Sequence, residues 1–429
     1  MHHVLATALL AVLLTSSAAA RTASASLIDS LLDEARRGNP ALESAHAAWQ
    51  AERARTDAAG KLPDPRLTYG GFVQPVETRV GAQRHHVGIQ QTIPWFGSLG
   101  RERAVTHASS RAAKARLALT WIDVELQVTR TLHEIHHLDG LREIERQSLA
   151  LLQQFESVAR ARLRTNSTTN ADVLRLQIEL ARGEDRLRRL GDERLPTVER
   201  LNALLDRSPG TDLKVEPPLP TWPMPPQARE EALLASHPRL ELLRALALRA
   251  ERRTDVARDR GRPELTVGIT HTFVDPRDLD GLEGDGNDAT LATVSLNLPL
   301  WRGKVEAGVR AAEAERVSHE AALRDATNDL RARLQRARFD HEDAGRRIEL
   351  YEETLVPKAE ESLRATLDAY ATARADFGEL IDVQRTLLEF QRALLETRVA
   401  RANARAVIES LVPDPASIRD ALASMEVSR

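Results

Sequence analysis

Most of the chain places apolar residues at helical spacing, but two short stretches alternate apolar and small polar residues. In PELTVGITHTF (263–273), Leu265, Val267 and Ile269 alternate with threonine and glycine. The stretch PRLTYGGFV (65–73) has the same pattern. A period of two predicts a strand with one apolar face and one small polar face.

The two strand patterns belong to an internal repeat. Pro65 and Pro263 lie 198 positions apart, as do Pro40 and Pro238 in the helical segments before them. Each half continues with a second alternating stretch that closes on a proline. These stretches are HVGIQQTIPWFG (86–97) and TLATVSLNLPLWRG (290–303). A long helical pattern, a turn and a shorter helix follow each one, so the repeat unit is helix, hairpin, long helix, short helix.

The predicted helices are matched in length. In chain order they cover 29–60, 98–165, 171–206, 228–261, 304–373 and 376–411. In each repeat the combined length of the two short helices equals the length of the long helix. We therefore expect the short helices to stack end to end beside the long one. Leu380, Leu387 and Leu394 recur every seven residues, which indicates coiled-coil packing.

The termini and the joint between the repeats complete the predicted organisation. An apolar stretch (4–14) followed by Ala18 and Ala20 predicts a signal peptide over 1–20, although a helix that stays attached is the alternative. Residues 21–429 then form one domain of two repeats, 27–207 and 228–412. The proline-rich segment 215–227 joins them, and 413–429 is a C-terminal tail.

Composition narrows the function classes. The chain has 429 residues, of which 29% are charged and only 3% aromatic, which suits long helices better than a thick core. A net charge of −3 does not favour nucleic acid as a partner. Beyond the N-terminus no apolar run reaches the length of a membrane-spanning helix. The absence of cysteine excludes disulfides and a lipid anchor on an N-terminal cysteine.

The strands have the length of membrane-crossing strands. About ten residues cross a bilayer when a strand is tilted by about 45°. Four strands cannot close a barrel, and an open sheet edge is not tolerated in lipid, so copies of the chain must supply the rest. Aromatic residues that would form an interfacial girdle lie in or beside the strands: Tyr69, Phe72, Trp95, Phe96, Phe273 and Trp301. The alternative is a small soluble sheet attached to a coiled coil.

The turn regions RLRTNSTTNADVLRLQIELARGEDRL (162–187) and AYATARADFGELIDVQRTLLEFQ (369–391) resemble the paired helical tips of TolC-type outer-membrane efflux channels. IPWFG and LPLWRG resemble the family's junctions between strand and long helix. The resemblance implies an α+β membrane channel that is mainly α. In this architecture three chains build a periplasmic α-barrel of long coiled-coil-like helices and a 12-stranded β-barrel in the outer-membrane lipid.

The resemblance also implies partners and a function. The homotrimer would conduct metal cations or small toxic compounds passively, without a cofactor, from a periplasmic adaptor and an inner-membrane pump. QQTIPWFGSLGRE (90–102) is similar to channels that work with heavy-metal pumps of the resistance-nodulation-division class. A zinc peptidase and a structural coiled-coil protein of the envelope are the alternatives.

Matching the family's tips residue by residue implies a periplasmic gate. Asp172 takes the acidic position of the first tip, and Tyr370, Glu379 and Asp382 take the constriction positions of the second. Nearby arginines are candidate counter-charges for these carboxylates: Arg162, Arg164, Arg374 and Arg385. Asp172 and Asp376 can equally cap the helices that follow them.

The turns themselves are the expected docking tips for adaptor or pump. They comprise Asn166, Ser167, Thr168, Ala373, Arg374 and Ala375. Asn166 and Ala373 stand where the family usually has glycine. Asparagine tolerates a left-handed helix end and alanine does not, so the second turn is expected to differ in backbone.

Two further motifs have alternative interpretations. HEIHH (133–137) contains the H-E-x-x-H pattern of zinc peptidases, in which His133 and His137 would bind zinc and Glu134 would activate water. With His136 the same histidines are candidates for metal contact in transit. A solvent- or lumen-facing helix is the simpler interpretation. The acidic loop 275–288 lacks the register of a calcium loop and is expected to be solvated.

Overall fold

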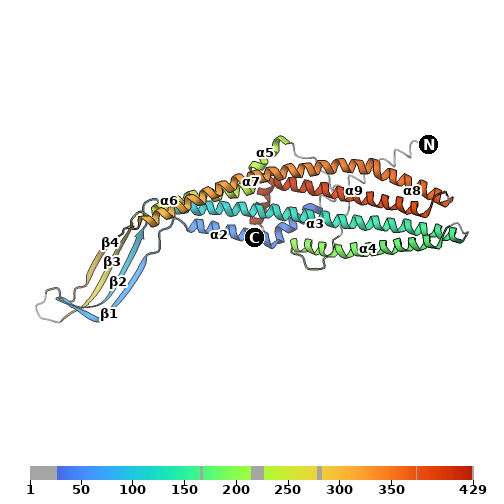
Figure 1. The fold of residues 1–429 in the computed structure, drawn as a ribbon. Coiled ribbons are helices and arrows are strands. Elements are labelled where there is room, and N and C mark those ends of the chain that lie inside the picture. The colour runs from blue at the N-terminus through green and yellow to red at the C-terminus, as the bar shows by residue number, and fades with distance from the viewer. Residues whose placement is uncertain (1–26, 165–167, 214–226, 278–282, 373, 428–429) are drawn as a thin grey trace, which may run out of the picture. The chain divides into compact units, whose positions relative to one another are not determined.

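The computed structural model describes residues 27–164, 168–213, 227–277, 283–372 and 374–427. These residues form mainly helices and one four-stranded sheet (Figure 1). The predicted signal peptide and Asn166, Ser167 and Ala373 of the predicted tips lie outside the described residues, as does the joining segment except Gln227.

The helices follow the predicted order. After a helix over residues 27–38, they are α2 (Pro40–Ala58), α3 (Ser98–Arg164), α4 (Asn170–Leu204), α5 (Gln227–Ala235), α6 (Pro238–Asp259), α7 (Arg302–Leu350), α8 (Val356–Ala371), α9 (Phe377–Leu411) and α10 (Pro415–Val427).

The predicted helices 29–60 and 228–261 are each broken once, which corrects the sequence prediction. The breaks precede Pro40 and Pro238, the first residues of α2 and α6. A proline disfavours the helical conformation in the residue before it but fits the first helical position itself. At the first break Asn39 also caps α2, because its Oδ1 accepts hydrogen bonds from the backbone nitrogens of Ala41 (2.9 Å) and Leu42 (3.2 Å).

The second long helix and the C-terminal tail also differ from the prediction. The helix predicted over 304–373 contains a π-helical turn, η1 (Tyr351–Leu355), in which the Val356 nitrogen donates to the Tyr351 carbonyl. Pro357 follows immediately and has no backbone donor, so a local change in hydrogen bonding is expected there. The predicted tail contains a helix, α10, whose first turn is capped by Asp414.

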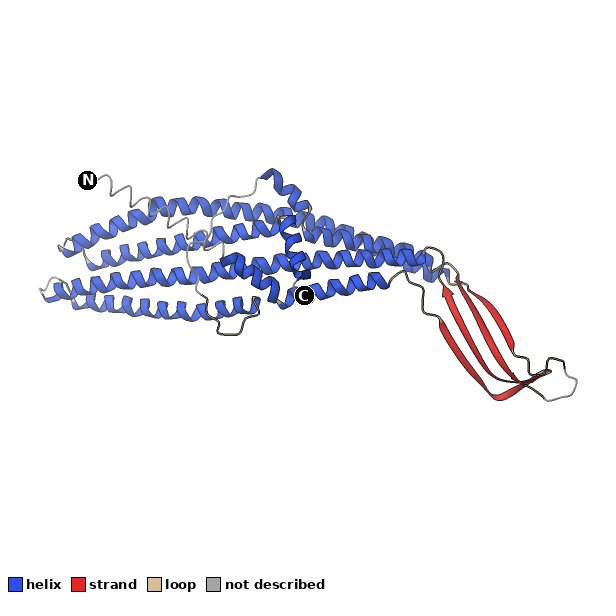
Figure 2. Cartoon of the chain, turned by 180° about the vertical axis from the view of Figure 1, so that it is seen from behind, coloured by secondary structure: helices blue, strands red, loops and turns tan. Residues whose placement is uncertain are grey.

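The four strands form one antiparallel sheet in the order β1-β2-β3-β4 (Figure 2). They are β1 (Arg66–Thr78), β2 (Gly81–Ile93), β3 (Glu264–Asp275) and β4 (Ala289–Asn297). The predicted ranges 86–97 and 290–303 extended too far, because β2 ends just before Pro94 and β4 ends two residues before Pro299. Proline cannot donate to a strand ladder, so it terminates pairing.

The chain divides into two compact units, each of which contains parts of both predicted repeats. The first comprises Met1–Ser44, Ala118–His237 and Thr327–Arg429, and the second comprises Ala45–Leu117 and Pro238–Ala326. The first unit is helical and has a hydrophobic cluster contributed by α3, α4, α8 and α9. The second holds the sheet with α2, α6 and the adjoining ends of α3 and α7, which ion pairs such as Arg253–Glu315 (2.9 Å) connect.

Candidate functional site

The sheet of the second unit is amphipathic across all four strands. Its ladder places Leu67 opposite Ile89, Ile89 opposite Ile269, and Ile269 opposite Ala292. Since directly paired residues project to the same face, one face is apolar over the whole sheet. These side chains are exposed in the single chain, and Val294 on the same face reaches 75%.

The opposite face carries small and polar residues. Thr68, Gly88 and Thr270 are paired across β1, β2 and β3. A Cβ atom added at Gly88 would lie 2.8 Å from the Thr270 hydroxyl, so glycine is needed for this close approach. Thr92 and Thr266 share a hydrogen bond of 3.1 Å on the same face. The threonine and glycine face is suited to contact with water, whereas the apolar face is suited to an apolar environment.

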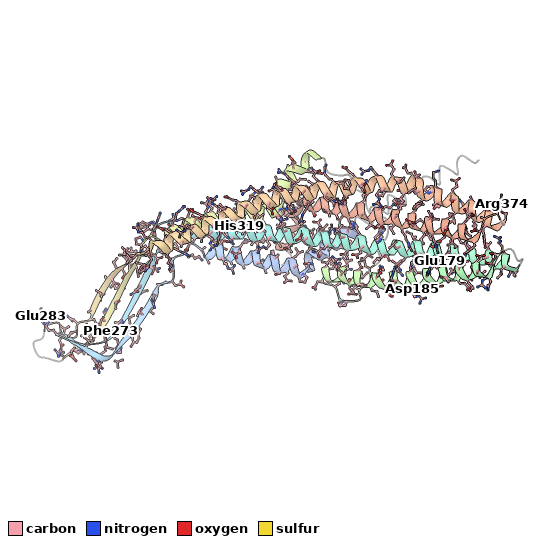
Figure 3. The ribbon with its side chains drawn as sticks, viewed as in Figure 1. Glu179, Asp185, Phe273, Glu283, His319 and Arg374 are labelled. Atoms are coloured by element: carbon pink, nitrogen blue, oxygen red, sulfur yellow. The ribbon has the colours of Figure 1, made fainter. Side chains whose placement is uncertain are left out.

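Three of the predicted aromatic residues, Phe96, Phe273 and Trp301, lie at or near the ends of the strands, whereas Tyr69 and Phe72 lie within β1. Phe96 and Trp301 are 85% and 80% exposed just beyond β2 and β4. At the other end, Phe273 (labelled in Figure 3) packs edge-on against His271, with 4.8 Å between ring centres. His271 in turn contacts Asp288 at 3.1 Å, so polar groups accompany the aromatic rings there.

Both predicted tip turns lie at the same end of the first unit (Figure 1). The first tip is the turn between α3 and α4, and the second tip is the turn between α8 and α9. Residues on either side of both turns share one hydrophobic cluster, which includes Phe155, Val173, Leu363 and Leu380. The two helical hairpins therefore pack together behind their turns.

Thr169 is the N-cap of α4 at the first tip, and Asp172 completes a capping box with it. Asp172 Oδ2 accepts hydrogen bonds from the backbone nitrogen (3.1 Å) and the hydroxyl (2.7 Å) of Thr169, while Thr169 Oγ1 accepts from the Asp172 nitrogen at 3.3 Å. Thr168 donates to the same carboxylate at 3.1 Å. Burial opposes ionisation, but these hydrogen bonds and the charge of Arg175 together hold the pKa of Asp172 below its ordinary value. The alternative of a helix cap is thus confirmed for this residue.

Asp376 is the corresponding cap at the second tip, since its Oδ1 accepts from the Glu379 nitrogen at 2.8 Å. Glu379 and Asp382 project into solvent from the first turns of α9, on the side opposite Leu380 and Ile381. The single chain therefore presents both carboxylates on an open helix face.

Tyr370 is buried between the two hairpins and has only 1% of its surface exposed. The Arg162 guanidinium lies 4.2 Å from the Tyr370 ring centre and also donates to the Tyr370 carbonyl oxygen. Thr168 approaches the Tyr370 hydroxyl at 3.5 Å. These contacts link the first tip directly to the second.

The predicted arginines differ in their contacts. Arg385 of α9 pairs with Glu179 of α4 at 2.7 Å and lies 3.7 Å from Asp382. Arg374 donates to the Thr372 hydroxyl at 3.0 Å, within its own turn, and Arg164 is exposed. Figure 3 labels Glu179 and Arg374 near this end of the first unit.

A buried charge network, which the sequence analysis missed, connects three helices farther along the first unit. Glu145 of α3 is fully buried and pairs with Arg186 of α4 (3.2 Å) and with Arg392 of α9. Gln384 donates to Ser148 at 2.7 Å nearby. Removing one partner of such a network leaves a buried charge without compensation, which is costly. Nothing in the sequence pattern marks Glu145, because its partners are distant in the chain.

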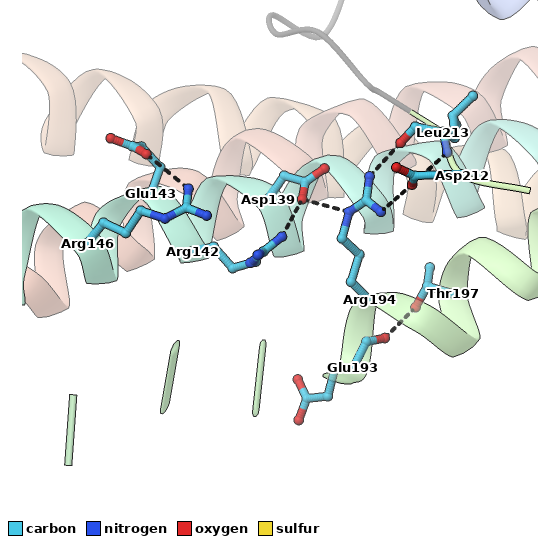
Figure 4. Close-up of polar contacts among 9 residues, drawn as sticks. All are labelled: Asp139, Arg142, Glu143, Arg146, Glu193, Arg194, Thr197, Asp212 and Leu213. Atoms are coloured by element: carbon cyan, nitrogen blue, oxygen red, sulfur yellow. Dashed lines mark hydrogen bonds and ion pairs between the residues drawn. The ribbon is translucent and has the colours of Figure 1, made fainter. Parts of the chain in front are cut away.

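Arg194 makes a second connection of this kind (Figure 4). It extends from α4 to Asp139 of α3 at 2.8 Å, and it contacts Asp212 at 3.1 Å and the Leu213 carbonyl at 2.5 Å. The side chain thus fixes α3, α4 and the segment after α4 to one another.

The geometry does not favour a zinc site at the H-E-x-x-H motif. His133 is buried and its Nδ1 is hydrogen-bonded to Asn403 at 2.8 Å, while Glu134 faces solvent 3.9 Å from Arg200. Burial lowers the pKa of His133, and the same holds for His136 and His137. No group of three or more metal-binding side chains occurs among the described residues.

In the described ranges, no helix combines the length and apolarity needed to cross a membrane.

Comparisons with known proteins support the fold. Residues 231–412 match the family model described as outer membrane efflux protein. No curated protein sequence matches the chain at a significant level. Among solved structures, the outer membrane protein VceC of Vibrio cholerae is 20% identical with a TM-score of 0.76, over 90% of this chain and 96% of that one.

Two further channels have the same fold. CusC is 15% identical with a TM-score of 0.76, over 90% of this chain and 91% of that one. The MtrE channel of Neisseria gonorrhoeae, crystallised in an open state, is 15% identical with a TM-score of 0.74. The match covers 90% of this chain and 88% of MtrE.

Proposed function

We propose that this chain, a member of the outer membrane efflux protein family, acts as a homotrimeric conduit with a gate at its two tips. Proteins of this family are channels rather than enzymes, and they work in the outer membrane with a periplasmic helical tunnel. They export substrates together with an adaptor and an inner-membrane pump.

The amphipathic sheet with two open edges is the observation that carries the proposal. β1 and β4 each have a neighbour on one side only, and the apolar face is exposed. The apolar face suits lipid, but the unpaired backbone groups of the two edges are tolerated there only if further copies pair with them. Two copies would give a barrel of about eight strands filled by side chains, whereas three give about twelve and leave a passage. The threonine and glycine face then lines that passage.

The gate follows from threefold symmetry. Glu379 and Asp382 have open positions on α9, so three copies at a narrow aperture bring several carboxylates close together and attract cations. Arg162 with Tyr370, and Arg385 with Glu179, connect α8 and α9 to the α3–α4 hairpin. An exposed ion pair such as Arg385–Glu179 contributes only about 0.2–1 kcal/mol, so the closed state is held by few strong contacts and docking can open it.

The tips are the proposed docking surface for a periplasmic adaptor or a pump of the resistance-nodulation-division class. The described residues of this surface are Thr168, Arg374 and Ala375, and Asn166, Ser167 and Ala373 complete the proposed surface. Metal cations or small toxic compounds are the proposed cargo, since the acidic face of α9 favours cations. The apolar sheet face would contact outer-membrane lipid.

Single-channel recording on the purified protein in planar bilayers tests this function. A trimer by light scattering, with defined conductance and cation preference, is the expected result. A soluble monomer that inserts into no bilayer would support the structural coiled-coil alternative instead.

A further inference from the structure

The first unit contains a half-open cavity of about 620 Å³, separate from the tips. Its walls come from the helix over residues 27–38, α3, α5, α9 and the segment that begins α10. The wall is largely apolar, with aliphatic side chains from every one of these elements, such as Ile28, Ile122, Leu233, Ala406 and Ile418. The volume is that of a small-molecule site, for which about 300–1,000 Å³ is usual.

The charged groups around this cavity are predominantly acidic. Four carboxylates line it, from Asp29, Glu125, Glu409 and Asp414, against the two guanidinium groups of Arg229 and Arg405. The Arg405 charge is already paired with Glu409 at 2.9 Å. The Asp414 carboxylate caps α10 through the Ala416 nitrogen at 3.2 Å.

Of the four carboxylates, Asp29 and Glu125 have no hydrogen-bond or ion-pair partner among the described residues; Asp29 is exposed, so the less exposed of the two is Glu125. It is half-buried in the wall, and within the described part of the chain its side chain forms no hydrogen bond or ion pair. Burial, and then the like charge of Glu409, raise the pKa of Glu125 to about 7. An ionised carboxylate in such a place is destabilised unless a cation compensates it.

We propose that this cavity binds a small amphipathic amine, with its apolar body against the aliphatic wall and its ammonium group at the Glu125 carboxylate. An anion is disfavoured because the carboxylates outnumber the guanidinium groups. A bare metal ion is disfavoured because the wall is aliphatic and the described residues contain no group of three metal-binding side chains.

Binding of the amine should depend on pH through Glu125. The charged groups that face it are Asp29 and Arg36 on the helix over residues 27–38, Arg229 on α5, Arg405 and Glu409 on α9, and Asp414 before α10. His133 on α3 also lines the cavity, and burial lowers its pKa, so it is neutral at pH 7 and above. Raising the pH through 7 ionises Glu125 and should therefore tighten binding of the amine. Below pH 7 the amine should bind with release of the proton from the Glu125 carboxyl group.

The test uses three adamantane compounds of nearly equal size on the detergent-solubilised full-length protein. Titration calorimetry with 1-aminoadamantane, 1-adamantanol and adamantane-1-carboxylate compares a cation, a neutral compound and an anion. At pH 8 the amine should bind at least tenfold more tightly than the alcohol, and the carboxylate should bind most weakly. The preference for the amine should shrink at pH 5.5.

The substitution Glu125→Gln should reduce amine affinity about tenfold and leave alcohol affinity unchanged. Glu143→Gln is the matched control, because Glu143 also lies on α3 but is exposed and pairs with Arg146 at 3.4 Å. Equal binding of amine and alcohol, no binding of any compound, or an unchanged amine affinity in Glu125→Gln would each overturn the proposal. If Glu125→Gln fails to assemble, the comparison of the amine, the alcohol and the carboxylate on the unsubstituted protein tests the proposal without the variant. None of these outcomes depends on channel conductance.

Discussion

Arg162 of α3 places its guanidinium 4.2 Å from the centre of the Tyr370 ring on α8, and the two residues are separated by 208 positions in the chain. The same arginine donates to the Tyr370 carbonyl oxygen. One side chain thus connects the two helical hairpins directly beside their turns.

The first prediction concerns this contact. Arg162→Ala removes both the cation–π contact and the hydrogen bond, so it should weaken closure of the tips and raise basal conductance. A cation–π contact alone contributes about 0.5–2 kcal/mol. Single-channel recording measures the effect, and Arg160→Ala is the control, because Arg160 pairs only locally with Glu156 on α3. Equal basal conductance in the two variants would show that the contact between Arg162 and Tyr370 does not hold the tips closed.

The second prediction concerns selectivity. Replacing Glu379 and Asp382 by alanine should reduce cation selectivity and weaken block by multivalent cations added on the periplasmic side, because the carboxylates face open space on α9. Reversal potentials in asymmetric salt measure this. Glu184→Ala on α4 is the control, since Glu184 is also exposed. Unchanged selectivity in the double variant would place the constriction elsewhere.

The third prediction concerns the sheet faces. Leu296 and Ser295 are neighbours on β4 and project to opposite faces. Leu296→Arg should destabilise the inserted protein by about 2–4 kcal/mol if it lies near the middle of the bilayer, whereas Ser295→Arg should be tolerated in an aqueous passage. Urea unfolding from lipid vesicles measures the difference. The opposite ranking would reverse the assignment of the two faces.

The fourth prediction separates a conduit from a peptidase. Glu134→Gln and His137→Ala should leave efflux-dependent resistance intact, because Glu134 faces solvent and no metal-binding group surrounds these residues in the described structure. The measurement is growth at inhibitory substrate concentrations in a strain that lacks its own channel. Loss of resistance in Glu134→Gln, with the protein still assembled and inserted, would contradict this.

The fifth prediction concerns stability and pH. The folded-state pKa of Glu125 is raised from 4.5 to about 7, so the folded protein resists ionisation that the unfolded chain undergoes readily. Stability should therefore fall as pH rises from about 4.5 to 7 and then level off, at a cost of about 1–3 kcal/mol per chain. Glu125→Gln should remove this loss. Its melting temperature should exceed that of the unsubstituted protein at pH 8 and match it near pH 4.5.

Local sequence patterns predict the four strands and most of the helix ranges in agreement with the structure. These features depend on short-range patterns: alternation along Leu265, Val267 and Ile269, and heptads at Leu380 and Leu387. The caps were equally local, since Asp172 and Asp376 bond within their own first turns. Errors in the ranges occurred where proline acts on its neighbours, as before Pro40 and Pro238.

Contacts between residues that are distant in the chain depend on how the helices pack. Glu145 reaches Arg186 and Arg392, and Arg162 reaches Tyr370, through the packing of separate helices. The direction of a side chain around a long helix drifts with each turn, so no pattern within one helix identifies its partner on another. The cavity beside Glu125 has the same origin, because its wall forms only when five distant segments come together.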